Sequence, residues 1–182
     1  MAASKLMSYF TYEDYKYWED SWELIDGIPY AMAPTPYPKH QKIVFAISKE
    51  LDKNLNCTFK EICEVYISPV DWKIDDSSVV QPDVAIFYEK TEKQYFSKTP
   101  LLIVEVLSLS TALKDTTTKF ELYQREGVKC YIIVNPNEQK AEIFELENDK
   151  YFLREKIDQD GEYKFSHDGC EVNIDFGVVF GF

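Results

Sequence analysis

Hydrophobic residues recur along this chain with two different periods, and the period predicts which segments form helices and which form strands. Between residues 39 and 55 the apolar side chains come at every fourth position, at Ile43, Ile47, Leu51 and Leu55. This spacing places them on one face of an amphipathic helix. Three other segments are short, nearly continuous apolar runs: residues 79–87, 101–107 and 129–134. Runs of that length, rich in β-branched residues, predict strands buried on both faces.

Turn residues and capping residues predict where further hairpins and helices begin and end. Asp26-Gly27 separates two apolar stretches and predicts a hairpin, and Asn148-Asp149 predicts a second hairpin between residues 140–146 and 151–156. Thr11 is a candidate N-cap for a short helix within residues 9–20. Asp115 is a candidate N-cap for a helix from Thr116 to Glu126 that ends at Gly127, and the apolar tail, residues 169–182, is expected to add an edge strand.

The order of these elements predicts an α/β or α+β domain with a mixed sheet, because one helix crosses between two buried strands. The chain has 182 residues, a length that suits one domain, and it contains no repeat or linker. We therefore expect residues 1–182 to form a single domain.

Charge and composition restrict the classes of function. The chain has 20 basic and 32 acidic residues, a net charge of −12, which argues against a protein that coats phosphates without sequence preference. A local basic groove, or a metal that bridges carboxylates to phosphate, stays open. No apolar run reaches the roughly 18–20 residues of a membrane span, and the first ten residues lack the pattern of a secretory signal.

The four cysteines, Cys57, Cys63, Cys130 and Cys170, are far apart in the chain and form no Cys-x-x-Cys pair. That spacing does not indicate a zinc site. We expect reduced, partly buried thiols in a cytoplasmic protein.

Two acidic residues stand out because their neighbours are apolar. Asp83 lies within the run 79–87, and Glu105 lies within the run 101–107. A carboxylate in a doubly buried strand is costly unless it is paired, hydrogen-bonded or bound to a cation. On adjacent strands these two acids would offer the oxygen ligands that Mg²⁺ or Mn²⁺ prefers.

A lysine follows these acids in the chain. Lys119 is placed 14 residues after Glu105, and in a helix it would share one face with Asp115 and Tyr123. That helix could bring Lys119 over the strand ends. A group made of carboxylates, a metal and a lysine suits phosphodiester hydrolysis, because the metal activates water and the lysine orients it or stabilises charge on phosphorus.

These residues resemble a known family. Pro82-Asp83, Glu105-Val106 and Lys119 look like the PD-(D/E)XK nuclease motif with its lysine moved to the following helix, since Leu107 occupies the usual lysine position. The surrounding sequence resembles the Uma-two family of restriction endonucleases in six segments: Trp22-Glu23-Leu24-Ile25-Asp26-Gly27, Gln81-Pro82-Asp83-Val84, Val104-Glu105-Val106-Leu107-Ser108, Asp115-x-x-x-Lys119, Tyr123-x-x-x-Gly127-Val128 and Tyr131-Ile132-Ile133-Val134. The resemblance spans roughly residues 8–147.

The resemblance implies a restriction-endonuclease-like α/β fold, in which helices flank a central mixed β-sheet. It implies a Mg²⁺-dependent or Mn²⁺-dependent endonuclease acting on nucleic acid, with DNA as the expected substrate. Asp83 and Glu105 would be the metal ligands and Lys119 the catalytic lysine. It also implies that two copies could form a homodimer.

Three further residues are candidate accessories, each with a structural alternative. Glu23 is either an additional carboxylate near the metal or a cross-strand charge. His40 either faces the cleft or neighbours a helix cap, and Tyr123 is either near the site or a packing residue whose hydroxyl finds a partner.

Two functional alternatives remain. The net charge of −12 also fits a nuclease fold that binds nucleic acid or protein without cleaving it. A glycosidase built on two carboxylates fits less well, because its acids line a sugar cleft and do not flank a lysine.

Overall fold

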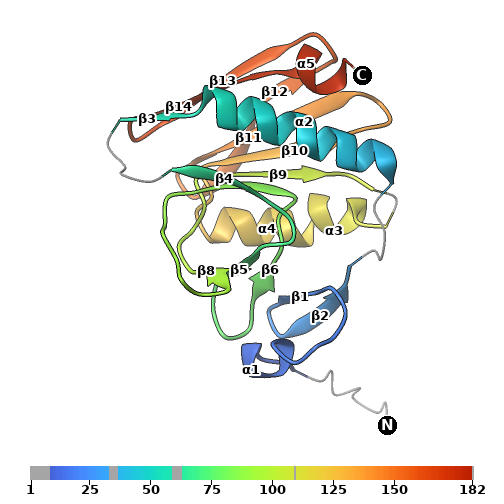
Figure 1. The fold of residues 1–182 in the computed structure, drawn as a ribbon, viewed down its shortest axis with the longest axis vertical. Helices are drawn as coiled ribbons and strands as arrows, with labels where there is room; N and C mark the ends of the chain where they lie inside the picture. Colours follow the sequence, from blue (N-terminus) through green and yellow to red (C-terminus); the bar gives the residue numbers. More distant parts are fainter. Residues whose placement is uncertain (1–8, 33–36, 59–62, 109, 182) are drawn as a thin grey trace.

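A six-stranded mixed sheet forms the centre of the molecule (Figure 1). The computed structural model describes residues 9–32, 37–58, 63–108 and 110–181. The expectation about a secretory signal therefore lies largely outside the described residues. The strands of the central sheet, in spatial order, are β12 (Lys150–Ile157), β11 (Lys140–Glu147), β10 (Cys130–Asn135), β9 (Leu102–Val106), β7 (Val84–Phe87) and β4 (Glu64–Ile67).

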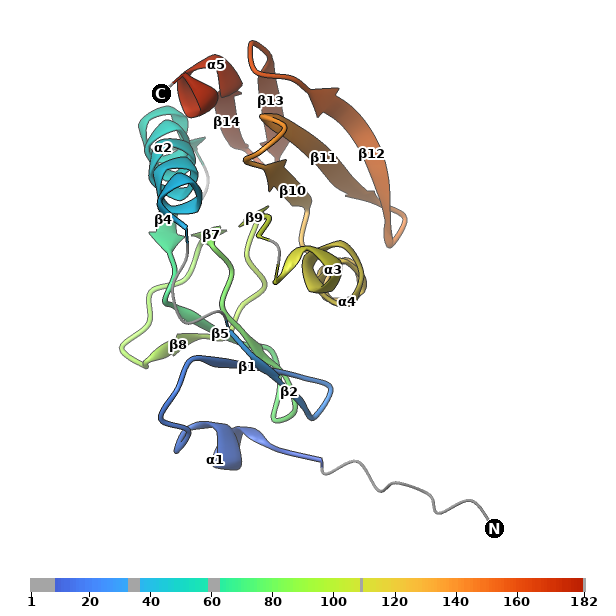
Figure 2. The same ribbon diagram turned by 90° about the vertical axis from the view of Figure 1, so that its right-hand side faces the viewer.

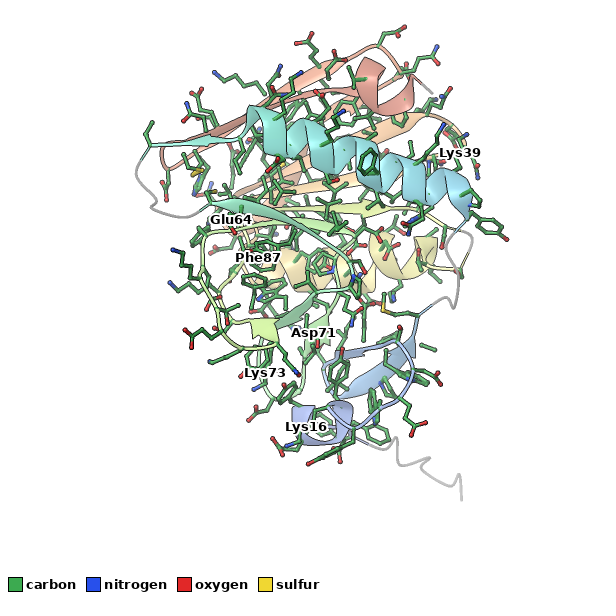
Figure 3. The ribbon with its side chains drawn as sticks, in the orientation of Figure 1. Lys16, Lys39, Glu64, Asp71, Lys73 and Phe87 are labelled. Atoms are coloured by element: carbon green, nitrogen blue, oxygen red, sulfur yellow. A yellow bond between two sulfur atoms is a disulfide. The ribbon has the colours of Figure 1, made fainter. Side chains whose placement is uncertain are left out.

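Only one pair of neighbouring strands in this sheet is parallel, the pair formed by β9 and β10. A parallel pair needs a crossover connection, and here the connection carries two short helices, α3 (Ala112–Thr116) and α4 (Thr118–Arg125). The other pairs are antiparallel; Glu64 of β4, for example, lies opposite Phe87 of β7 (Figure 3). The prediction of a mixed sheet with one helical crossover is confirmed.

Helices cover the two faces of the sheet (Figure 2). The amphipathic helix predicted from the four-residue spacing is α2 (Pro38–Asn54), which begins with a proline at its first position and buries Ile43, Ile47 and Leu51 on one face. Helices α3 and α4 lie on the opposite face. Alternate residues of β9 face the two sides: Leu102, Val104 and Val106 belong to the core under α2, and Ile103 belongs to the core under α4.

Two smaller sheets flank the central one. The five-stranded sheet contains, in spatial order, β2 (Ile28–Ala31), β1 (Trp22–Ile25), β6 (Val79–Val80), β5 (Asp71–Lys73) and β8 (Tyr95–Phe96). The helix α1 (Tyr12–Tyr15) lies beside β1, and its N-cap Thr11 donates its backbone N–H and its hydroxyl to Asp14. The predicted turn at Asp26-Gly27 is confirmed, with both residues at positive φ, and a Cβ on Gly27 would clash with the ring of Tyr9.

The three-stranded sheet contains β13 (Glu162–His167), β14 (Cys170–Asp175) and β3 (Asn56–Cys57), and α5 (Phe176–Phe180) follows it. The tail was expected to add an edge strand, and this prediction is wrong. β14 is the central strand of its sheet, because β13 pairs with one edge of it and β3 with the other. Its alternating residues Val172 and Ile174 are buried in the core under α2.

The prediction of four reduced thiols is wrong for two of them. Cys57 and Cys170 form a disulfide across 113 residues of chain. The antiparallel register of β3 and β14 places the two residues directly opposite each other. That pairing could not be derived from the spacing of cysteines in the sequence.

Two other predicted elements are divided. The run 79–87 forms two strands in different sheets, β6 and β7, because Pro82 between them has no N–H to donate. The helix predicted from Thr116 to Glu126 begins earlier, as α3, and is interrupted at Thr117 before α4. Gly127 follows α4 at φ 82°, as predicted.

Candidate active site

A cavity of about 300 Å³ lies at the end of the central sheet, between α2, α3 and the start of the β1–β2 hairpin. Four acidic side chains and two lysines line it: Glu23, Asp83, Glu105, Asp115, Lys114 and Lys119. Of the predicted site residues, only Tyr123 is not part of the lining. The sequence positions of these residues span 23 to 119, so the fold brings distant segments together.

Asp83 and Glu105 meet because β7 and β9 are antiparallel neighbours. Val84 lies opposite Val104, and the register continued by one residue places Asp83 opposite Glu105. Asp83 itself precedes β7 and so does not lie within a strand, contrary to the prediction. Its Oδ2 accepts a hydrogen bond of 2.8 Å from the backbone N–H of Val106. The carboxylate thereby extends the strand pairing where the backbone of β7 ends.

Glu105 is the penultimate residue of β9 and faces α4. Its Oε1 accepts hydrogen bonds from Lys119 Nζ and from the hydroxyl of Tyr123, each at 2.7 Å. Lys119 and Tyr123 are one helical turn apart on α4, so they reach the same oxygen. The structure therefore brings together Asp83, Glu105 and Lys119 at one pocket.

Glu23 is completely buried, and its carboxylate binds both lysines. Oε1 lies 2.8 Å from Lys119 Nζ and also accepts the backbone N–H of Gln81, while Oε2 is paired with Lys114. With both oxygens occupied by N–H donors, Glu23 has the geometry of a residue that holds the lysines. The sequence left two roles open for Glu23, an additional carboxylate near the metal or a cross-strand charge, and did not reveal that it pairs with two lysines.

Asp115 is not an N-cap, contrary to the prediction, because α3 has already begun three residues earlier. It lies in the last turn of α3, is 1 % exposed and lines the cavity. Its Oδ1 accepts no hydrogen bond from any described residue and is 4.0 Å from Lys119 Nζ. Asp115 and Lys114 both line the cavity. The sequence placed Asp115 on the helix face of Lys119 but did not single out Lys114.

His40 lies in the first turn of α2 and faces the cleft, one of its two proposed placements. Its Nε2 is 3.2 Å from Asp83 Oδ2, and its Nδ1 is buried without a partner among the described residues. Burial lowers the pKa of His40, but the hydrogen bond and the negative charge of Asp83 outweigh it, so the net pKa is raised. An imidazolium at this position would fix the orientation of Asp83.

The crowding of carboxylates determines the electrostatics of the cavity. Burial raises the pKa of Glu105 well above its ordinary value, and the charges of Asp115, Asp83 and Glu23 add to this against the opposing effect of Lys119. Burial likewise raises the pKa of Asp115.

The carboxylates around Lys119 keep this lysine in its charged form. Burial lowers the pKa of Lys119, but the carboxylates of Glu105, Glu23 and Asp115 outweigh it and raise the net pKa well above the ordinary value. Burial raises the pKa of Glu23, but Lys119 and Lys114 reverse this and lower it. Four acidic side chains and two lysines face one cavity, and a divalent cation bound there would favour the ionised form of the acids.

The donor set suits a hard divalent ion. Glu23 is saturated by lysines, which leaves oxygens of Asp83, Glu105 and Asp115 facing the cavity. Mg²⁺ is commonly bound by one or two carboxylates and keeps several waters, so a pair of acids on adjacent strands suffices. Asp115 Oδ1 accepts no hydrogen bond from the described residues, so a cation or one of its bound waters would be stabilised there.

A second polar network joins the cavity to α1. Gln81 lines the cavity, and its side-chain amide donates to Asp71 Oδ1 at 2.7 Å, which also accepts the hydroxyl of Tyr15 at 3.0 Å. Asp71 lies in β5 beside α1 (Figure 3). The aromatic helix α1 is thereby fixed to the strand that leads to Asp83.

The architecture defines the class of protein: a restriction-endonuclease-like α/β fold. Its backbone is similar to the crystal structure of "a putative nuclease belonging to DUF820" from Anabaena variabilis ATCC 29413, with a TM-score of 0.74 and 16 % sequence identity. That match covers 94 % of this chain and 98 % of the other. A family model described as "Uma2: Putative restriction endonuclease" matches residues 11–169. The chain belongs to the Uma2 family. No curated protein matched it.

No helix in the described ranges combines the length and apolarity that a membrane crossing requires.

Proposed function

We propose that this protein is a metal-dependent endonuclease that hydrolyses phosphodiester bonds in nucleic acid, with DNA as the expected substrate. Membership of the Uma2 family supports the reaction class. One observation carries the assignment to residues: Lys119 Nζ is 2.7 Å from Glu105, and Asp83 is at the position opposite Glu105 on the adjacent strand. An acid–acid–lysine group in a cavity is what this chemistry needs.

Asp83 and Glu105 would hold Mg²⁺ or Mn²⁺. When bound, such an ion lowers the pKa of a coordinated water and neutralises charge on the phosphate. Tyr123 and Lys119 keep Glu105 in place by donating to Oε1, and His40 and the N–H of Val106 do the same for Asp83. All four contacts fix the carboxylates before substrate arrives.

Lys119 would orient the attacking water. An ammonium group has three N–H donors, and here two are used by Glu105 and Glu23. The third is available for a water or for a phosphate oxygen. Lys114, whose side chain is 12 % exposed, would offer its remaining donors to the phosphate at the cavity mouth.

The test is a cleavage assay on plasmid and single-stranded DNA with Mg²⁺ or Mn²⁺. Lys119→Met should lower the rate at least about 100-fold, because it removes the positioned donor. Lys164→Met, which changes an exposed lysine of β13 paired with Glu171, should leave the rate unchanged. Equal rates for the two variants would overturn the assignment of Lys119.

The same assay separates the proposal from its alternative. A folded wild-type protein that binds nucleic acid and shows no metal-dependent nicking would be an interaction module. Sedimentation measurements test the homodimer that the family resemblance implies.

A further inference from the structure

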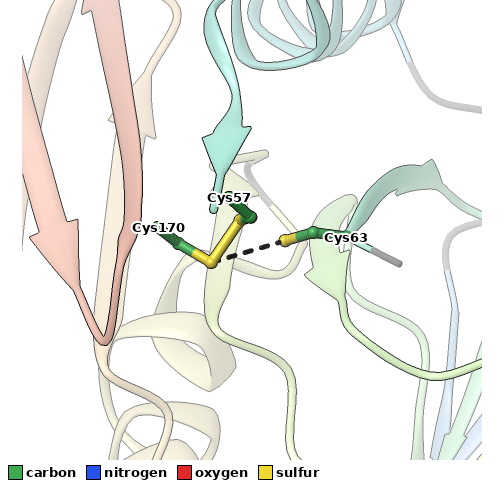
Figure 4. A group of neighbouring side chains, drawn as sticks. All are labelled: Cys57, Cys63 and Cys170. Atoms are coloured by element: carbon green, nitrogen blue, oxygen red, sulfur yellow. Dashed lines mark hydrogen bonds between the residues drawn. A yellow bond between two sulfur atoms is a disulfide. The ribbon is translucent and has the colours of Figure 1, made fainter. Parts of the chain in front are cut away.

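Three of the four cysteines lie close together, although they come from distant parts of the chain (Figure 4). Cys57 ends β3, Cys170 begins β14, and Cys63 directly precedes β4. The three sulfur atoms all lie within 4.8 Å of one another, and no other group of three metal-ligand atoms in the described parts of the chain is this close. The cluster is separate from the cavity that contains Asp83 and Glu105.

The local backbone holds two of these sulfurs in place. Asp168 and Gly169 both have positive φ and form the turn between β13 and β14, so Cys170 is placed immediately after it. The carbonyl of Gly169 accepts both the backbone N–H and the hydroxyl of Thr58, at 3.0 and 3.1 Å. This fixes the chain beside Cys57 to the start of β14.

The third sulfur is at the distance that a shared metal ion needs. Cys63 Sγ is 3.9 Å from Cys170 Sγ. Two thiolates bound to one tetrahedral zinc ion, each at about 2.3 Å, are roughly 3.8 Å apart. Cys63 and Cys170 therefore need no rearrangement, and Cys57 needs only to separate from Cys170.

The surroundings also admit a cation. Cys170 is 1 % exposed, whereas Cys57 and Cys63 are half-buried, so an ion and a fourth ligand such as water can reach the cluster from solvent. Asp168 lies in the β13–β14 turn, two residues before Cys170. A negative charge close to a thiolate cluster attracts a cation.

We propose that the three cysteines form a binding site for a thiophilic ion, Zn²⁺, when the protein is reduced. A thiol reductant supplies the two electrons: it breaks the Cys57–Cys170 bond to give two thiols and is itself oxidised to a disulfide. Zn²⁺ then displaces the thiol protons of Cys57, Cys63 and Cys170 and bonds to the three sulfurs. The ion would join the three-stranded sheet to β4 at the edge of the central sheet.

The metal site would use Cys63 together with the two cysteines of the disulfide. In the oxidised form Cys57 and Cys170 connect only strands of the three-stranded sheet. In the reduced form the ion would add a connection through Cys63 to a second sheet. The proposal is independent of the nuclease activity, because none of its residues lines that cavity.

The experiment is a zinc titration of the full chain, reduced and kept without oxygen, in competition with a chromogenic chelator. Wild type should bind one equivalent, and Cys63→Ala should bind at least about 100-fold more weakly. Cys130→Ala is the matched control, because Cys130 is buried in β10 away from the cluster, and it should bind like wild type. With Co²⁺ in place of Zn²⁺, wild type and Cys130→Ala should show a thiolate charge-transfer band that Cys63→Ala lacks.

Circular dichroism would check that the Cys63→Ala variant is folded, and Cys63→Ser provides a second variant with a smaller change of shape. Asp83→Asn should retain the cobalt band, which keeps this test apart from the Mg²⁺ site. Zinc affinity in Cys63→Ala equal to that of wild type would overturn the proposal. Failure of the reduced wild-type protein to bind zinc would also overturn the proposal.

Discussion

Lys119 and Glu23 are joined by an ion pair of 2.8 Å in which both side chains are almost completely buried. Ninety-six positions separate them in the chain, and Glu23 binds Lys114 with its other oxygen. One buried carboxylate thus neutralises part of the charge of two lysines and fixes the position of both. Glu23 acts on the proposed chemistry through these lysines, as a positioning residue.

Replacing Glu23 should destabilise the fold and weaken activity together. Glu23→Gln keeps an oxygen for the N–H of Gln81 but leaves two buried ammonium groups with less compensation. We expect a loss of about 3–5 kcal/mol in the free energy of unfolding, measured by urea denaturation. Glu121→Gln on the exposed face of α4 should change it by less than about 0.5 kcal/mol. A small effect of Glu23→Gln would show that the lysines find other partners.

Asp83→Asn removes the negative charge at the proposed metal site but can keep the hydrogen bond with the backbone N–H of Val106. Asparagine retains an oxygen that can accept the N–H of Val106, so the fold should persist. It loses the negative charge that binds a divalent ion, and Mn²⁺ affinity measured by calorimetry should fall at least about tenfold. Unchanged Mn²⁺ affinity in a folded variant would exclude Asp83 as a ligand.

Tyr123→Phe tests the hydrogen bond beneath Glu105. The variant removes the hydroxyl that donates to Oε1 at 2.7 Å within the core. We expect a destabilisation of about 1–3 kcal/mol, because a buried carboxylate loses one of its donors. Tyr66→Phe also removes a bond to a carboxylate, that of Glu64, but at an exposed position. Tyr66→Phe should lower the free energy of unfolding by clearly less than Tyr123→Phe, as measured by urea denaturation. Equal losses in the two variants would contradict the importance of burial.

A pH-dependent contribution to stability is expected from Glu89, in the segment between β7 and β9. Burial raises the pKa of Glu89, but the backbone N–H groups of Lys98 and Ser97 and the hydroxyl of Ser97 outweigh it and lower the net pKa. A lowered pKa in the fold gives stability that is present above the unfolded value, near 4.3, and is lost as pH falls through the folded value.

Glu89→Gln should therefore destabilise by less than about 1 kcal/mol at pH 7, because solvent screens these exposed hydrogen bonds, and the difference from wild type should shrink below about pH 4. Thermal unfolding at several pH values measures this. Glu92→Gln, exposed in the same segment, is the control and should show no such trend. A difference that is constant with pH would rule out the carboxylate as its source.

Elements with a strong local signal could be predicted from the sequence. The four-residue spacing predicted α2, the Asp26-Gly27 pair predicted the β1–β2 hairpin, and the apolar run predicted β9 as a strand buried on both faces. In each case the period or the turn chemistry agrees with the tertiary contacts. The divided segments differ, because Pro82 removes one backbone donor and thereby separates two strands that then pair in different sheets.

The site could be predicted only in part. Asp83 and Glu105 were recognisable because charged residues within apolar runs need a compensating partner, and Lys119 was recognisable from its position after Glu105 and from the family resemblance. The partner of Lys114 is Glu23, 91 positions away, and nothing local specifies such a pair. The Cys57–Cys170 disulfide likewise could not be predicted from local sequence, because it depends on the register between β3 and β14.

The hydrogen bond from Val106 to Asp83 has a consequence for how this sequence can diverge. The backbone N–H of Val106 in the central sheet donates to a side chain, so Asp83 is part of the scaffold as well as part of the proposed reaction centre. Relatives that abandon catalysis should keep an oxygen-bearing residue there, with asparagine the most economical substitute. Relatives with alanine at the position of Asp83 should have another acceptor for the backbone N–H of Val106.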